Sequence, residues 1–212
     1  MAVGTWLPSP GAGVLRRAGP ASRLQNIPLE YFARAARVLG PQPGVDPRHI
    51  VLLGDSRGGE AALLVASTFP RLVHGAIGLV PSDSAYPAPA ANLRAWTLHG
   101  KPVPLGQIPV ERISGPVLTA GAGEDQVWSS RQSVASIEHR LRARRFPYAH
   151  HGLIYQRAGH LVGAAMPYTP EPAGITYGGT TQSNAAAKEQ LWPPHPSLLR
   201  HGVDRPGSSS GS

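Results

Sequence analysis

The stretch IVLLGDSRGGEAALLVAS, residues 50–67, passes from an apolar run through a glycine-rich turn into an alanine-rich helical pattern. Branched residues dominate the apolar run, which is typical of a strand buried on both faces of a sheet. The motif GDSRG, residues 54–58, fits G-x-S-x-G, in which small flanking residues let the chain turn sharply around the serine. We therefore predict a strand over residues 49–54, a helix over residues 58–69 and Ser56 at the tip of the turn between them.

Strands and helices alternate on both sides of this stretch. Helical spacing begins at Pro28 and stops at Gly40, and a further helix is expected over residues 128–145. Short apolar runs predict three more strands, over residues 73–80, 115–123 and 151–159. This alternation predicts an α/β fold, with a mostly parallel sheet flanked by helices.

The ends of the chain have a different character. Residues 1–26 keep no helical or strand period, and we expect an irregular segment there. The predicted domain covers residues 27–201 and ends in a helix over residues 184–201, which two prolines interrupt. Residues 202–212 end in SSSGS and are expected to be disordered.

Composition narrows the class of protein. The chain of 212 residues suits one domain, and 41% apolar with 15% charged residues suits a folded protein. Cysteine is absent, which excludes disulfides, thiolate metal sites and a cysteine nucleophile. No run approaches the roughly 20 apolar residues of a membrane helix. Prolines and glycines interrupt the first 20 residues before a signal-peptide core could form, so we expect a cytoplasmic protein with no membrane partner.

The net charge of +8 raises the alternative of a nucleic-acid binder. The basic residues are spread along the chain, and only RLRARR, residues 140–145, is a dense cluster. This cluster lies near the end of a predicted helix, where cations favour the negative end of the helix dipole. We interpret it as a solvated helix end, with a contact to ligand phosphates as the alternative, and expect no nucleic-acid partner.

Two later residues stand where Ser56 would need them. A serine hydroxyl is a weak nucleophile unless a base takes its proton and a third group orients that base. Asp125 directly follows the third predicted strand and His160 the fourth, so both are expected at the same edge of the sheet as Ser56. For Asp125 the alternatives are a helix N-cap, or Glu124 in its place. For His160 the alternative is an ordinary loop histidine.

Other residues receive supporting or ordinary roles. The backbone N–H of Arg57 is a candidate oxyanion donor, and Glu60 either supports the site from behind or is simply exposed. Trp128 and Trp192 are interpreted as packing anchors. The stretch AYPAPAAN, residues 85–92, together with His99, belongs to an insertion that could cover the site. We expect no metal and no cofactor, because His150 and His151 precede their strand, at the wrong end, and lack partners at ligand spacing.

Three stretches carry a family resemblance: GDSRGGE, GAGEDQVWSS and AGHLVGAAMPYTP. They resemble the signatures of the acyl-CoA thioester hydrolase and bile acid-CoA:amino acid N-acyltransferase family, in its C-terminal α/β-hydrolase domain, which is related to dienelactone hydrolases. The resemblance implies Ser56 as nucleophile, Asp125 as orienting acid and His160 as base, acting on an acyl thioester or a related ester. Family members that transfer acyl groups to amino acids tend to carry a cysteine nucleophile, so the serine favours hydrolysis.

The resemblance also implies parts that are not visible in this sequence. Family members carry an immunoglobulin-like domain and several strands before the helix that begins at Pro28. A loop after an early strand would supply the second oxyanion donor, and residues 1–26 offer no such loop. Without early strands, the strand over residues 49–54 would expose an edge. We expect a second copy or a partner to cover it, and the alternative function is a truncated, impaired remnant that acts as an interaction module.

Overall fold

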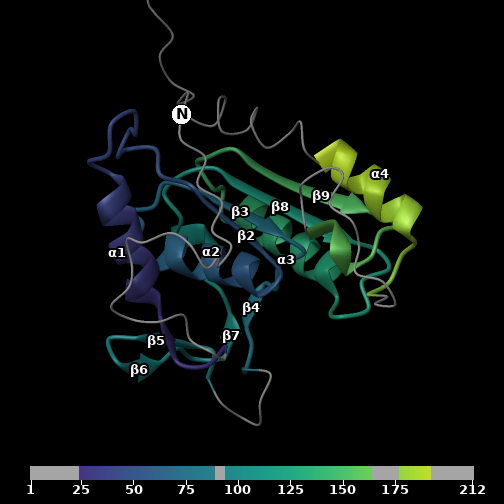
Figure 1. Ribbon diagram of the computed structural model, residues 1–212, viewed down its shortest axis with the longest axis horizontal. Helices are drawn as coiled ribbons and strands as arrows, with labels where there is room; N and C mark the ends of the chain where they lie inside the picture. The colour runs from purple at the N-terminus through teal and green to yellow at the C-terminus, as the bar shows by residue number, and fades with distance from the viewer. Residues whose placement is uncertain (1–23, 89–93, 164–176, 192–212) are drawn as a thin grey trace, which may run out of the picture.

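A four-stranded parallel sheet forms the centre of the protein. The computed structural model describes residues 24–88, 94–163 and 177–191, and the segment 1–23, Trp192, the two prolines after it and the tail lie outside these ranges. The strand order is β2-β3-β8-β9 (Figure 1). The bounds of these strands are Leu52–Asp55 for β2, Ala76–Leu79 for β3, Val117–Ala122 for β8 and His150–Tyr155 for β9. The predicted α/β fold with a mostly parallel sheet is therefore confirmed.

The helices also follow the predicted alternation. Their bounds are Leu29–Leu39 for α1, Arg57–Thr68 for α2, Ser130–Ala143 for α3 and Thr181–Leu191 for α4. Two 3-10 turns complete the frame, η1 over Val110–Arg112 and η2 over His160–Gly163. The last helix begins three residues earlier than predicted, at Thr181, because Oγ1 of Thr180 accepts from the N–H of Ser183 at 3.1 Å and caps the first turn there.

One detail of the predicted fourth strand is wrong. His150 and His151 do not precede β9 but are its first two residues, paired with Val117 and Leu118 of β8. The prediction failed because a sequence pattern locates the end of a strand only to within one or two residues. Pairing with β8 extends β9 to His150. Both histidines lie at the amino end of β9, opposite to the end that leads to His160.

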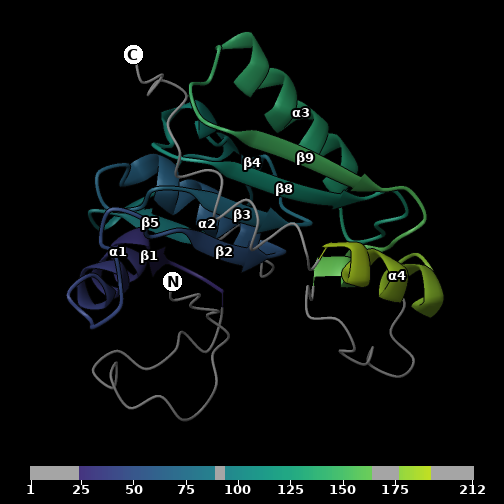
Figure 2. The same cartoon turned by 90° about the horizontal axis from the view of Figure 1, so that it is seen from above.

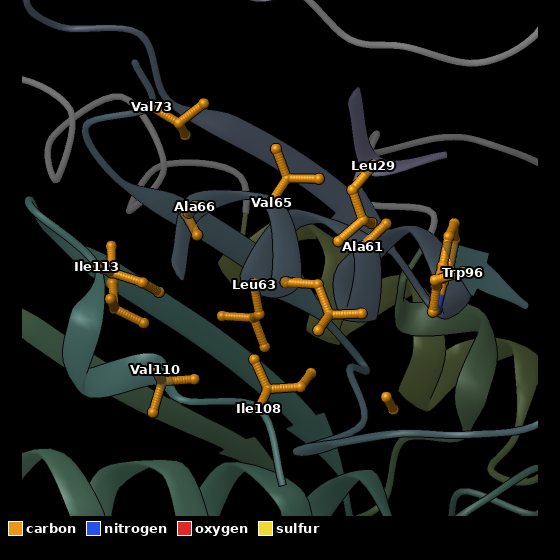
Figure 3. Close-up of a cluster of buried hydrophobic side chains, with 14 of the residues drawn as sticks. Leu29, Ala61, Leu63, Val65, Ala66, Val73, Trp96, Ile108, Val110 and Ile113 are labelled. Atoms are coloured by element: carbon orange, nitrogen blue, oxygen red, sulfur yellow. The ribbon is translucent and has the colours of Figure 1, made fainter. Parts of the chain in front are cut away.

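The two faces of the sheet carry separate cores, because side chains alternate along each strand. One core lies where α2, α3 and η1 cover the sheet, and Figure 3 shows part of it, with Leu63 of α2 facing Ile108 and Val110. The other core lies on the side of α4, which buries Leu191 against it. Figure 2 shows the sheet from above, with α3 and α4 on opposite sides. The sheet is thus a rigid base for the loops at its carboxyl edge.

The chain between β3 and β8 forms an insertion with small sheets of its own. Strand β5 (Trp96–Leu98) pairs with β6 (Lys101–Pro102) and with β1 (Ile27–Pro28). Strand β4 (Ser84–Ala85) pairs with β7 (Gly106–Gln107). In Figure 1 these strands lie beside α1 and α2, apart from the central sheet. The insertion therefore begins next to the helix that follows Ser56.

Neither outer strand of the sheet has a further partner strand among the described residues. Strand β9 ends the sheet on one side, and on the other side no strand of the described residues pairs with the outer edge of β2. Val51 and Leu53 are only partly buried there, beside the core on the α4 side. Within the same ranges, no helix is both long and apolar enough to cross a membrane.

Candidate active site

Ser56 lies at the tip of a strained turn between β2 and α2. Its backbone has φ 57° and ψ −119°, a combination that costs an L-residue free energy and that occurs mainly at functional sites. Its N–H donates to the carbonyl of Leu79 at 2.8 Å, which ties the turn to β3. The strained turn holds the hydroxyl clear of the sheet.

The two glycines of the motif differ in what requires them. A Cβ at Gly54 would overlap the carbonyl of Gly58, so the turn admits no side chain there. A Cβ at Gly58 would meet no described atom within 4 Å. The expectation that both positions must be small therefore holds for Gly54 alone in this structure. A Cβ at Gly59 would lie 3.2 Å from the carbonyl oxygen of Leu79, so Gly59 is the second crowded position.

A continuous chain of contacts joins Ser56 to Asp125 through His160. The hydroxyl oxygen Oγ of Ser56 lies 2.7 Å from Nε2 of His160. On the other side of the ring, Nδ1 lies 2.9 Å from Oδ2 and 3.0 Å from Oδ1 of Asp125. These distances suit proton transfer between the serine and an oriented imidazole.

Asp125 is held independently of the histidine. Its Oδ1 accepts hydrogen bonds from the N–H groups of Val127 at 2.9 Å and Trp128 at 3.2 Å. Burial opposes ionisation of its carboxyl, but hydrogen bonds from His160 and Ser130 outweigh it and hold the pKa below the ordinary value. Asp125 is thus ionised at neutral pH.

The alternatives for the acid are not supported by this geometry. Asp125 does not cap α3, because the N-cap residue of that helix is Ser129. Glu124 is exposed, and its N–H donates to Ala158 while the ring of His160 contacts Asp125. Of the two neighbouring carboxylates, only Asp125 contacts the histidine in the described part of the chain.

His160 is enclosed by aromatic side chains. Trp128 meets its ring edge-on, with centroids 5.0 Å apart, and Tyr177 lies at 6.2 Å. The indole N–H of Trp128 donates to the carbonyl of Val80 at 3.0 Å. Val80 has a positive φ of 40°, which is unusual for a β-branched residue. Trp128 was interpreted from the sequence as a packing anchor, and here its packing partner is the histidine.

The side chains of Arg57 and Glu60 form a buried network behind the serine. Glu60 has 0% exposure, and its Oε2 accepts from the guanidinium of Arg57 at 2.6 Å. Its Oε1 accepts from the indole N–H of Trp96 at 2.6 Å and from the N–H of Tyr86 at 3.2 Å. Arg57 also donates to the carbonyl of Pro87 at 2.9 Å.

This network connects the site to the insertion. Burial raises the pKa of Glu60, while Arg57, Trp96 and Tyr86 act in the opposite direction. Glu60 is therefore not exposed, which removes one of its two sequence interpretations. The backbone N–H of Arg57 lies at the first residue of α2, where helix N–H groups have no partner within the helix. Residues 1–23, whose sequence offers no loop for a second oxyanion donor, lie outside the described residues.

The described residues contain no group of three or more His, Asp or Glu side chains arranged to hold a metal ion. The basic cluster at the end of α3 is partly paired within the protein. Arg140 donates to Glu111 at 2.6 Å, and Arg142 to Glu138 at 3.2 Å. Arg142, Arg144 and Arg145 are exposed, as the interpretation of a solvated helix end expects, whereas Arg140 is only partly exposed.

Comparisons with known proteins identify the family of the chain. The family model described as BAAT / Acyl-CoA thioester hydrolase C terminal matches residues 27–85 and 94–201. Acyl-coenzyme A thioesterase 1 of Mus musculus is 30% identical over 207 residues, covering 80% of this chain and 47% of the relative. Acyl-coenzyme A amino acid N-acyltransferase 1 of Mus musculus is 26% identical over 204 residues, with 80% and 47% covered. The chain spans about half the length of the curated relatives it matches.

Solved structures share the fold at low identity. A dipeptidyl peptidase 4 of Porphyromonas gingivalis superposes with a TM-score of 0.54 at 16% identity, covering 82% of this chain and 22% of that one. An esterase of Pyrobaculum calidifontis superposes with a TM-score of 0.52 at 16% identity, with 83% and 61% covered. These likenesses establish an α/β-hydrolase fold.

Proposed function

Because the chain belongs to the BAAT / Acyl-CoA thioester hydrolase C-terminal family, we propose that it is a serine hydrolase that cleaves an acyl thioester or a related ester. The observation that carries this proposal is the chain of contacts from the hydroxyl of Ser56 through His160 to Asp125. The names of the relatives, which include acyl-coenzyme A thioesterases, support an acyl-CoA as the substrate class.

In the proposed reaction, Oγ of Ser56 attacks the acyl carbonyl carbon while Nε2 of His160 takes the hydroxyl proton. The carbonyl oxygen becomes an oxyanion, and the backbone N–H of Arg57 donates to it. When the intermediate collapses, the carbon–sulfur or carbon–oxygen bond breaks and His160 returns the proton to the leaving group. The acyl group is then bound to Ser56 as an ester.

The second half of the reaction uses the same groups in reverse. His160 takes a proton from water, the resulting hydroxide attacks the acyl-enzyme, and the proton returns to Ser56 as the carboxylic acid leaves. Asp125 stays ionised throughout, and its negative charge stabilises the imidazolium through the contact with Nδ1. Glu60 and the side chain of Arg57 touch no reacting atom in this scheme, and they support the site by fixing the start of the insertion.

A fluorophosphonate probe tests the nucleophile directly. We expect the purified chain to be labelled once, and labelling to vanish in Ser56→Ala. Ser129→Ala is the matched control, because Ser129 is exposed near the site and its side chain makes no capping hydrogen bond. Labelling that survives in Ser56→Ala would contradict the proposal.

Water and an amino acid are the two candidate acceptors for the acyl group. One relative is named an amino acid N-acyltransferase, whereas other relatives are named thioesterases. We propose water as the acceptor in this chain. Incubation with an acyl-CoA and glycine, analysed by mass spectrometry, should yield free acid. Acyl-glycine as the main product would favour transfer.

The open edge of β2 supports a second candidate, an interaction module without catalysis. It predicts a folded chain that the probe does not label. In either case we propose that a second copy of this chain covers the edge, because exposed strand edges pair readily. We propose no nucleic-acid partner. We also propose a cytoplasmic location; two relatives are named mitochondrial, so fractionation of cells is the test.

A further inference from the structure

A second carboxylate lies beside the turn that carries His160. Asp55 is the last residue of β2 and directly precedes Ser56. A Cβ built on Gly163 would overlap Oδ1 of Asp55 and would lie 2.6 Å from a methyl group of Val80. Gly163 ends η2, the 3-10 turn that begins at His160. The Asp55 carboxylate therefore occupies the notch that the missing side chain of Gly163 leaves.

The charges around Asp55 come from three elements. His160 faces it from η2, Lys188 from α4 and Asp125 from the loop after β8. The pKa of Asp55 is raised to about 6, because desolvation and, to a smaller extent, the charge of Asp125 outweigh the charges of His160 and Lys188, which lower it. The residue as a whole is exposed, so the contact of Oδ1 with Gly163 defines its role better than its burial does.

We propose that Asp55 is a positioning residue for His160. Its carboxylate fills the notch at Gly163 and so fixes the η2 turn relative to Ser56, and its negative charge stabilises the protonated form of the imidazole. The proposal rests on the proposed function, in which His160 is the base.

Asp55 and Asp125 would then act on the same histidine in different ways. Asp125 contacts Nδ1 of the ring and sets its orientation. Asp55 acts through the backbone turn at Gly163 and through its field. The environments of the two carboxylates displace their pKa values in opposite directions, raised for Asp55 and lowered for Asp125.

The pH profile of fluorophosphonate labelling tests the charge. Asp55→Asn keeps the shape of the side chain and removes its charge, so we expect the acid limb of the labelling rate to shift. Asp46→Asn, on the loop before β2, changes the net charge equally and should leave the profile unchanged. Identical profiles for Asp55→Asn and the unchanged chain would overturn the field component.

A double-mutant cycle tests the notch. Gly163→Ala and Asp55→Ala should each slow fluorophosphonate labelling about tenfold or more, because small displacements of a base are costly. The loss caused by Gly163→Ala should be smaller in the Asp55→Ala background, where the new methyl no longer overlaps a carboxylate. Additive losses would overturn the positioning role, and equal circular dichroism spectra would exclude misfolding as their cause.

The two proposals fail in different ways. If the unchanged chain is not labelled, the proposed function fails. If the chain is labelled at Ser56 but Asp55→Asn does not shift the acid limb of the labelling rate against pH, the inference about Asp55 alone fails. The acid limb is expected to move to lower pH, because labelling needs neutral His160.

Discussion

At the scale of the residue, the site depends on a few atoms with narrow tolerances. Ser56 has a strained backbone conformation with a positive φ. The carboxylate that contacts His160 is that of Asp125 rather than that of its neighbour Glu124. The two carboxylates differ in environment: Asp125 accepts backbone and histidine hydrogen bonds, whereas Glu124 is exposed. Residue identity at one position therefore separates an orienting acid from an ordinary surface charge.

Asp125→Asn tests this separation. The amide cannot stabilise the imidazolium, so we expect the fluorophosphonate labelling rate to fall about 10³–10⁴-fold. Glu124→Gln is the matched control, because it makes the same chemical change one residue away and should cost less than twofold. A similar loss in both variants, or a larger loss in Glu124→Gln, would show that the acid is assigned wrongly.

At the scale of the element, α2 is bound to the insertion by a buried charge. Glu60 accepts from Arg57 within α2 and from Tyr86 and Trp96 of the insertion. A buried carboxylate is unfavourable unless it is paired and hydrogen-bonded, and here every one of these contacts helps to satisfy it. The network therefore fixes where the insertion begins relative to the helix that carries Arg57.

Glu60→Gln is expected to lower the free energy of unfolding by about 1–3 kcal/mol, because the amide keeps a similar shape but loses the ionic contact with Arg57. Urea denaturation followed by circular dichroism measures the change. Glu189→Gln, at an exposed position on α4, should change stability by less than about 0.5 kcal/mol. Equal stability of the two variants would mean that the buried contact contributes nothing.

At the scale of the whole molecule, the outer edge of β2 has no partner strand among the described residues, and the charge of the site changes with pH. The N–H of Leu52 donates to the carbonyl of Gly75, next to β3. Successive N–H groups of a strand point to opposite sides, so the N–H of Leu53 points to the outer edge of β2. Unpaired groups on such an edge are available to another strand. The solution state of the chain therefore depends on what covers β2.

We expect the chain to self-associate at micromolar concentration and Leu53→Lys to weaken this association, because a charge on an edge strand opposes pairing. Sedimentation velocity measures it. Val38→Lys, at a residue of α1 that is 46% exposed, makes the same chemical change away from the edge and should leave association unchanged. A monomer at all concentrations would contradict the proposed second copy.

The pH dependence of stability carries opposite contributions from the two aspartates of the site. Asp55 has a raised pKa of about 6, so the folded state binds its proton more tightly and this contribution to stability falls as pH rises from about 4 to 6. Asp125 has a lowered pKa, so its contribution is present at neutral pH and is lost below about pH 4.

Thermal unfolding as a function of pH checks the sign for Asp55. Asp55→Asn should raise the melting temperature relative to the unchanged chain at pH 7, where the unchanged residue is ionised, and should change it little at pH 4. The opposite sign at pH 7 would mean that the charged carboxylate is favoured by its surroundings. Asp46→Asn again controls for the change in net charge.

Local pattern was enough for much of this protein. The alternation of apolar runs and helical periods predicted the parallel sheet, and the motif around Ser56 predicted a sharp turn between strand and helix. The positions of Asp125 and His160 after successive strands placed them at one edge, because parallel strands deliver their carboxyl ends to the same side. These features repeat over few residues, and a sequence displays them directly.

Contacts between distant segments were decided only by the tertiary structure. Ser56 and His160 are 104 residues apart, and no local pattern reveals that Asp125 rather than Glu124 meets the ring. Nor does it reveal that Asp55 fills the notch at Gly163. Which side chains meet depends on the relative positions of the turns at the carboxyl edge of the sheet, and packing across the whole sheet sets those positions. The sequence alone determined which elements form and which chemistry is available, and only the tertiary structure decided which side chains meet.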